Sequence, residues 1–149
     1  LLYILMREAP CALNVSSIAE EIKLSRATTM NYIKYLKDSR LINLLYLENK
    51  NFPMKPSKVF MQNTNLAQML TTRELSKQEL YETCFYASIH GSHKLNATER
   101  SAMFIVDGKY YFDVRETTPQ RDTIRPTAIG TLETGRGNMI PLWLLGFLY

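Results

Sequence analysis

One stretch decides how the first part of this 149-residue chain folds: Ser25-Arg26-Ala27-Thr28-Thr29-Met30-Asn31-Tyr32-Ile33-Lys34-Tyr35-Leu36, followed by Leu41-Ile42. Ser25 is a favourable N-cap, so a helix is predicted from Arg26 to about Ser39. Its apolar stripe has the helical spacing i, i+4, i+7 and consists of Thr29, Ile33 and Leu36. The polar side chains predicted near the opposite, solvent-facing side are Asn31, Lys34 and Tyr35.

Two shorter helices are predicted before this stretch and a hairpin after it. The first helix ends near Glu8, because Ala9-Pro10 disfavours its continuation. The second is capped by Asn14 or Ser16 and buries Val15, Ile18, Ala19 and Ile22. Residues 41–48 suit a buried strand, residues 49–56 a loop rich in Asn and Pro, and residues 58–62 a returning strand. Three helices and a hairpin with a basic tip predict a winged helix-turn-helix domain over residues 1–62.

The remaining residues, 63–149, predict a small α/β domain, so the fold class of the whole chain is α+β. A short helix is expected over 63–70 and a longer one from Arg73 to about His90, ended by glycine. Two strands, 101–106 and 109–115, flank the tight-turn signal Asp107-Gly108. Residues 116–130 are expected to be a loop, and the apolar tail 140–149 is expected to pack on the core or on a partner.

The positive charge is confined to the first part of the chain. The net charge is +4: residues 1–62 contain nine Lys/Arg and five Asp/Glu, and residues 63–149 contain nine of each. This asymmetry favours a polyanionic partner, although a merely solubilising surface is the alternative. The candidate DNA-contacting residues are Arg26, Asn31, Lys34 and Tyr35 on the third helix and Lys50 and Lys55 on the hairpin. Winged helices also serve as protein-interaction modules, so fold alone does not decide between DNA and protein.

Composition excludes several classes of protein. No apolar run reaches the ~20 residues of a membrane helix, and Cys11 and Cys84 do not form a CxxC motif, which together predict a cytoplasmic protein with no membrane partner. Cys84, His90 and His93 are too few to predict a metal site. The GxxxxGK[ST] motif of ATP sites is absent, so no catalytic residue and no cofactor are assigned. The chain begins with Leu1, so it is expected to be a segment of a longer protein.

The chain resembles the C-terminal region of a prokaryotic family of AAA-type ATPases. The resemblance rests on Ser25–Thr28 with Asn31–Leu36, on Lys55–Leu66, on Tyr81–Phe85 and on the ending Ile140–Tyr149. In that family an ATPase module is followed by a winged helix and then by a degenerate domain similar to the PD-(D/E)XK nucleases. The resemblance implies that ATP and Mg²⁺ bind only to the upstream module. It also implies that this segment is a non-catalytic recognition or regulatory portion, binding DNA, another protein or its own ATPase module.

The same resemblance indicates where nuclease chemistry would lie. That fold binds Mg²⁺ through an acid on one strand and an acid-x-Lys motif on the next. Here Met103 stands at the first acid position, Asp113 keeps the second acid, and Arg115 replaces the lysine. Glu82 and Asp107 are the carboxylates that could substitute, but neither is at the expected place. A structural hairpin is therefore predicted. The alternatives are a metal-dependent nuclease centred on Asp113 and a free-standing winged-helix transcription regulator.

Overall fold

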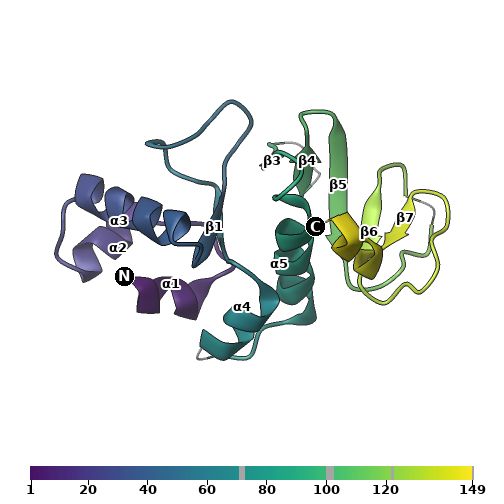
Figure 1. The fold of residues 1–149 in the computed structure, drawn as a ribbon, viewed down its shortest axis with the longest axis horizontal. Coiled ribbons are helices and arrows are strands. Elements are labelled where there is room, and N and C mark those ends of the chain that lie inside the picture. Colours follow the sequence, from purple (N-terminus) through teal and green to yellow (C-terminus); the bar gives the residue numbers. More distant parts are fainter. Residues whose placement is uncertain (71–72, 100–102, 122, 149) are drawn as a thin grey trace. The chain divides into compact units, whose positions relative to one another are not determined.

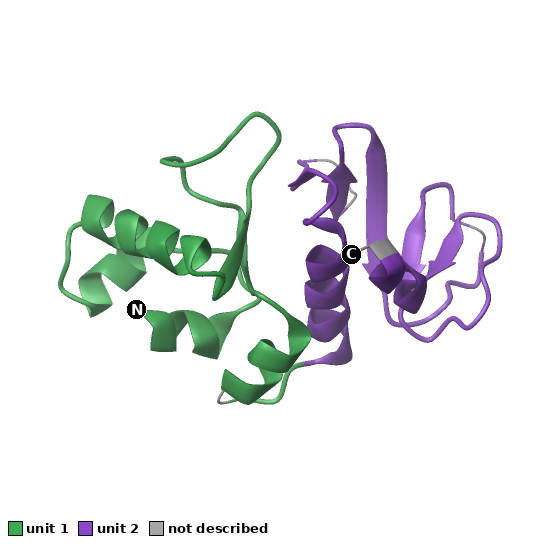
Figure 2. Cartoon of the chain, in the orientation of Figure 1, with its two compact units in different colours: residues 1–75 green, residues 76–149 purple. Residues whose placement is uncertain are grey.

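The protein has a mixed α and β architecture in the computed structural model, which describes residues 1–70, 73–99, 103–121 and 123–148 (Figure 1). This confirms the α+β class. Two compact units divide the chain, Leu1–Leu75 (unit 1) and Ser76–Tyr149 (unit 2) (Figure 2). The boundary differs from the expected one after Gln62. Residues 64–70 form a helix that stays with unit 1, because Ala67 is buried in that unit's core.

Unit 1 consists of four helices and a two-stranded antiparallel sheet. Its elements are α1 (Leu2–Glu8), α2 (Val15–Glu21), α3 (Arg26–Asp38), β1 (Ile42–Leu45), β2 (Lys58–Met61) and α4 (Thr64–Leu70). The cap of α2 is Asn14 rather than Ser16, since the Asn14 side chain accepts a hydrogen bond from the Ser17 amide at 3.3 Å. The Ser25 hydroxyl caps α3 by accepting from the Thr28 amide at 3.1 Å. Ile42 pairs with Met61 at one end of the β1–β2 ladder.

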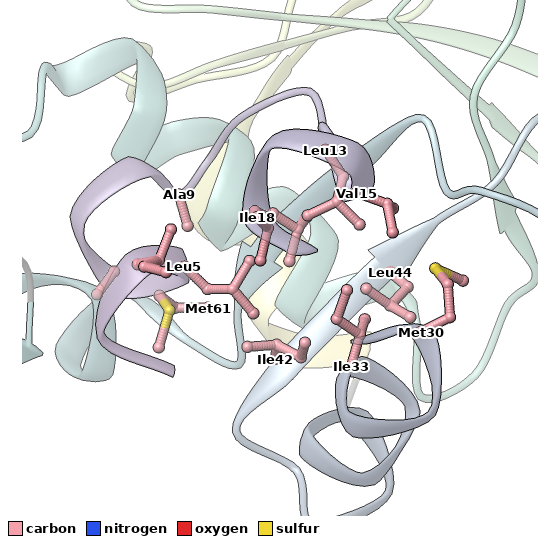
Figure 3. Packing of buried hydrophobic residues seen from close by; sticks show 13 residues of the cluster. Leu5, Ala9, Leu13, Val15, Ile18, Met30, Ile33, Ile42, Leu44 and Met61 are labelled. Carbon is pink, nitrogen blue, oxygen red and sulfur yellow. The ribbon is translucent and has the colours of Figure 1, made fainter. Parts of the chain in front are cut away.

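The core of unit 1 collects apolar side chains from α1, α2, α3 and both strands. Figure 3 shows Leu5, Ile18, Ile33 and Ile42 among the labelled residues of this cluster. Burying one such side chain is worth about 1.5–3 kcal/mol, so the cluster fixes how α3 is rotated. The buried residues of α3 are Thr29, Met30 and Ile33. The opposite side of α3 is therefore turned to solvent, as its spacing predicts.

Unit 2 is a helix packed on a five-stranded mixed sheet. Its elements are α5 (Lys77–Ile89), β3 (Leu95–Asn96), β4 (Phe104–Val106), β5 (Tyr110–Arg115), β6 (Thr127–Ile129), β7 (Met139–Pro141) and the 3₁₀ helix η1 (Leu142–Leu148). The strand order is β3-β4-β5-β6-β7; the pairs up to β5 are antiparallel and those after it parallel. Figure 1 shows α5 alongside β5. Phe85 of α5 makes ring contacts with Phe104 at 4.9 Å and Phe112 at 5.5 Å.

Unit 2 departs from the sequence predictions in several places. Helix α5 begins at Lys77 rather than Arg73, because Ser76 and Glu79 form a capping box. Strand β3 is an addition to the predicted elements, and β6 lies within the segment expected to be a loop. Residues 101–102 of the predicted strand lie outside the described residues. The tail divides: Leu142 and Leu145 are buried, whereas Trp143 and Phe147 are exposed.

None of the helices in the described part of the chain is long and apolar enough to cross a membrane.

Candidate functional site

The outer face of α3 presents polar and aromatic side chains. Asn31 and Tyr35 are exposed on the side opposite the core, and Tyr35 has 59% of its surface accessible. Arg26 is exposed at the start of α3, on the same side of the helix as the buried Met30 and Ile33. The rings of Tyr32 and Tyr35 lie 6.3 Å apart on the same helix. Because the buried stripe fixes the opposite side of α3 in the core, these side chains are available to a ligand without any rearrangement of unit 1.

Lys34 is engaged by neighbours within unit 1. Its ammonium donates a hydrogen bond to the Asp38 carboxylate at 2.8 Å, and this bond raises the pKa of Lys34. The same ammonium lies 5.9 Å from the centroid of the Phe52 ring, in the loop between β1 and β2. Lys34 therefore stays a predicted phosphate contact, although in the free chain its ammonium is paired with an exposed carboxylate of the same helix. The contact with Phe52 also shows that α3 and this loop are neighbours.

The β1–β2 loop, residues 46–57, supplies the other two predicted cations. Lys50 and Lys55 are exposed. They line a hollow of about 380 Å³, whose remaining lining residues are Leu47, Met54, Pro56 and Ser57. We call this hollow the loop pocket. The sequence did not predict it, although two lysines interleaved with apolar residues in a proline-containing loop were a visible signal.

The charge asymmetry persists with the observed boundary. Extending unit 1 to Leu75 adds Arg73 and Glu74, so its net charge stays at +4. Residues 76–149 contain eight Lys/Arg and eight Asp/Glu. The residues predicted for DNA contact thus all lie on the unit that has the entire excess of positive charge.

The degenerate nuclease positions are brought together in unit 2. Met103 directly precedes β4, and Asp113 and Arg115 lie on β5. The Met103 amide donates to the Asp113 carboxylate at 3.2 Å and to the Phe112 carbonyl at 3.1 Å. The half-buried Asp113 side chain is therefore a hydrogen-bond acceptor for the backbone where β4 begins. Arg115 is exposed.

The other two carboxylates are not placed to complete a site with Asp113. Neighbouring strand residues point to opposite faces of a sheet, and Phe112 faces α5, so Asp113 faces away from α5. Glu82 is buried on α5, where it accepts a hydrogen bond from Gln78 at 3.1 Å. Asp107 accepts a bond from the Lys94 amide at 2.9 Å and lies 2.7 Å from His93 Nδ1. The bond with His93, and then that with Lys94, lowers the pKa of Asp107.

The cysteines and histidines do not gather into a cluster either. Among the described residues, no group of three or more His, Cys, Asp or Glu side chains could hold a metal ion. Burial raises the pKa of the Cys11 and Cys84 thiols, which disfavours the nucleophilic thiolate form. His90 Nδ1 lies 2.9 Å from the Ala87 carbonyl, at the end of α5.

Comparison of the chain with models of known protein families, with curated proteins and with solved structures finds no match. The function of the chain is therefore inferred from the geometry of its own residues.

Proposed function

We propose that this chain is a non-catalytic recognition portion at the C-terminal end of an AAA-type ATPase, and that unit 1 binds duplex DNA. The AAA-type part of this proposal rests on the resemblance of the sequence. The observation that carries DNA binding is the exposed outer face of α3 beside the lysines of the β1–β2 loop. The order of three helices followed by an antiparallel hairpin supports assigning unit 1 to the winged helix-turn-helix class. In that class the third helix enters the major groove and the hairpin loop lies against the phosphate backbone.

Each exposed residue then has a chemical role. Asn31 carries an amide that can bond the N6 and N7 edge of adenine, and Tyr35 lies beside it on the outer face of α3. Arg26, at the first turn of α3, and Lys50 and Lys55, on the loop, neutralise phosphates. Lys34 is expected to contribute less to DNA binding than these three residues, because its ammonium already donates a hydrogen bond to Asp38. Binding is expected to be mainly electrostatic and to weaken steeply with salt.

Unit 2 is proposed to be a degenerate relative of the PD-(D/E)XK nucleases without hydrolytic activity. A helix followed by three antiparallel strands and a parallel fourth strand supports this assignment. Adjacency of Met103 and Asp113 supports it too, because the family pattern would place two metal-binding acids there. Methionine is a poor Mg²⁺ ligand, and arginine at position 115 does not readily release a proton.

A protein partner is the second candidate, favoured by the exposed Tyr32–Tyr35 pair. Tyrosine is enriched at protein interfaces because its ring buries a large area and its hydroxyl remains polar. The upstream ATPase module is the partner that this second candidate implies.

Titration of duplex DNA at about 50 and about 200 mM salt tests the proposal. The variant Lys50→Ala/Lys55→Ala should reduce the slope of log affinity against log salt by about 0.9 for each phosphate that the variant no longer neutralises. The matched control Lys37→Ala/Arg40→Asn removes two charges outside the proposed surface; Asn suits position 40, where φ is 56°. Asn31→Ala should change sequence preference more than the salt slope.

Absence of binding to any duplex at low salt, together with capture of the ATPase module through unit 1, would replace DNA by protein as the partner. If Lys50→Ala/Lys55→Ala and its control reduce the salt slope equally, DNA affinity depends only on the total charge of unit 1 and not on the proposed surface.

A further inference from the structure

The lining of the loop pocket is partly polar and charged and partly apolar, whereas a site for phosphate alone needs only the polar and charged part. Lys50 and Lys55 supply positive charge, and Ser57 supplies a hydroxyl. The other lining residues are apolar: Leu47, Met54 and Pro56. A ligand that satisfies both parts has an apolar or weakly polar body and an anionic group. The volume of about 380 Å³ lies within the range of small-ligand sites, which begins at roughly 300 Å³.

The loop around the pocket is held in shape by contacts with the rest of unit 1 and by hydrogen bonds of its own backbone. Phe52 packs against the core of unit 1, and the Lys34 ammonium lies 5.9 Å from the centroid of its ring. Two backbone hydrogen bonds fold the loop. The Met54 amide donates to the Asn51 carbonyl at 2.8 Å, and the Ser57 amide donates to the Leu45 carbonyl at 2.8 Å. Pro56 is buried. A ligand therefore meets a largely preformed site, which reduces the ordering cost of binding.

We propose that the loop pocket binds one unpaired nucleotide, with its base against Leu47, Met54 and Pro56 and its phosphate at Lys50 and Lys55. A nucleotide has both required parts, a flat base and an anionic phosphate. A base inside a duplex does not fit, because it is stacked and paired; an unpaired base exposes its face to apolar or aromatic side chains. This inference rests on the proposed DNA binding and directs it towards duplexes that have an unpaired end.

The chemistry is shared by two sources of ligand, an unpaired residue of a DNA strand and a free nucleoside monophosphate. Three probes distinguish them: a blunt duplex, the same duplex with a short unpaired thymidine tail, and thymidine monophosphate. The test variant is Met54→Ala, which removes apolar lining and no charge. The matched control is Met69→Ala, since Met69 is exposed on α4 and does not line the pocket.

With the wild-type chain, the tail is expected to raise affinity about tenfold over the blunt duplex, as burial of roughly 55 Å² of apolar surface would. Met54→Ala should remove most of this gain and leave blunt-duplex binding unchanged, and Met69→Ala should retain the gain. If thymidine monophosphate lowers the affinity for the tailed duplex to that of the blunt duplex and does not weaken blunt-duplex binding, the pocket also accepts the free nucleotide. A Met54-dependent gain without such competition assigns the pocket to strands only.

Equal affinity for tailed and blunt duplexes, or a gain that Met54→Ala does not reduce, would overturn the pocket assignment and leave duplex binding by α3 in place. If neither duplex binds at low salt, the proposed function fails, and direct titration with thymidine monophosphate then decides the pocket separately. Binding of thymidine monophosphate that Met54→Ala abolishes would support a nucleotide site in the loop pocket. Absence of such binding would overturn that site.

Discussion

Units 1 and 2 both place polar side chains where their proposed fold classes would use them, yet the two sets are engaged differently. On α3, Asn31 and Tyr35 are exposed on the side opposite the core. On β5, the Asp113 carboxylate accepts a hydrogen bond from the Met103 amide of the same unit. An exposed side chain keeps its bonding capacity for a ligand, whereas one that bonds the backbone has committed part of that capacity to the fold.

The two units also differ in net charge. Unit 1 has a net charge of +4, and residues 76–149 have none. This difference favours recognition of a polyanion by unit 1 rather than by unit 2. Five sets of substitutions test the contrast between the units.

The largest effect is expected from Phe85→Ala, which empties the centre of unit 2. Phe85 is fully buried and contacts Phe104 and Phe112, so its truncation should cost about 3–5 kcal/mol of unfolding free energy. Urea unfolding monitored by Trp143 fluorescence measures the unfolding free energy of unit 2, because Trp143 is the only tryptophan and lies in that unit. Ile124→Ala is the control, as Ile124 is 96% exposed. Similar effects for the two would contradict the assigned core.

The tail should divide into a structural side and an exposed side. Leu145 is only 7% exposed, and Leu145→Ala should cost about 2 kcal/mol, the lower end of the range for buried leucines. Phe147 is 78% exposed, and Phe147→Ala should change stability by less than about 0.5 kcal/mol. Thermal unfolding followed by circular dichroism measures both. A larger destabilisation by Phe147→Ala would show that the exposed side of η1 is packed after all.

Asp113→Ala should reduce stability by about 1 kcal/mol, because the Met103 amide loses its carboxylate acceptor but keeps the Phe112 carbonyl. Asp113→Asn retains an acceptor and should have a smaller effect. Adding Mg²⁺ should leave the melting temperature of the wild type unchanged, since a bound metal would raise it. Cleavage of plasmid DNA in Mg²⁺ that disappears in Asp113→Ala would make unit 2 a nuclease and remove the contrast between the units.

On unit 1, Asp38→Asn should release Lys34 for phosphate contact. Duplex affinity at low salt should rise, and the salt slope should steepen by up to about 0.9. Glu20→Gln makes the same charge change on α2 and is the control. Equal increases in the two variants would mean that net charge, rather than release of Lys34, is responsible.

The smallest effect concerns the Asp107–His93 pair. The pKa of Asp107 is lowered in the folded state, so its contribution to stability is present above the unfolded pKa and is lost as pH falls through the folded one. Asp107→Asn, which suits the φ of 54° at this turn, should therefore be slightly less stable than wild type near neutral pH. The difference should shrink as pH falls through the folded pKa of Asp107, and unfolding measured over an acid pH series tests this. A difference that persists in acid would point to backbone geometry instead.

Much of unit 1 could be predicted from its sequence because its signals are local. Ser25 lies three residues from the amide that it caps, and the stripe Thr29, Ile33, Leu36 lies within one helix. The Lys34–Asp38 pair also had a local signal, since residues four apart on a helix are neighbours. The residues of the loop pocket were also visible locally, but the pocket itself was not predicted, because its shape depends on how residues 46–57 fold back over the core.

The order of residues along the chain was enough to establish the helical stripe of α3, its cap, the hairpin that follows and the confinement of positive charge to the first part of the chain. Unit 2 depended more on the folded arrangement. Strand β6 has only three residues, and it is a strand because Thr127 pairs with Asp113 on one side and Met139 on the other. Such pairing joins residues far apart in the chain, so no short window of sequence contains it. For the same reason, only the folded chain shows that the carboxylate of Asp113 is bonded to the Met103 amide.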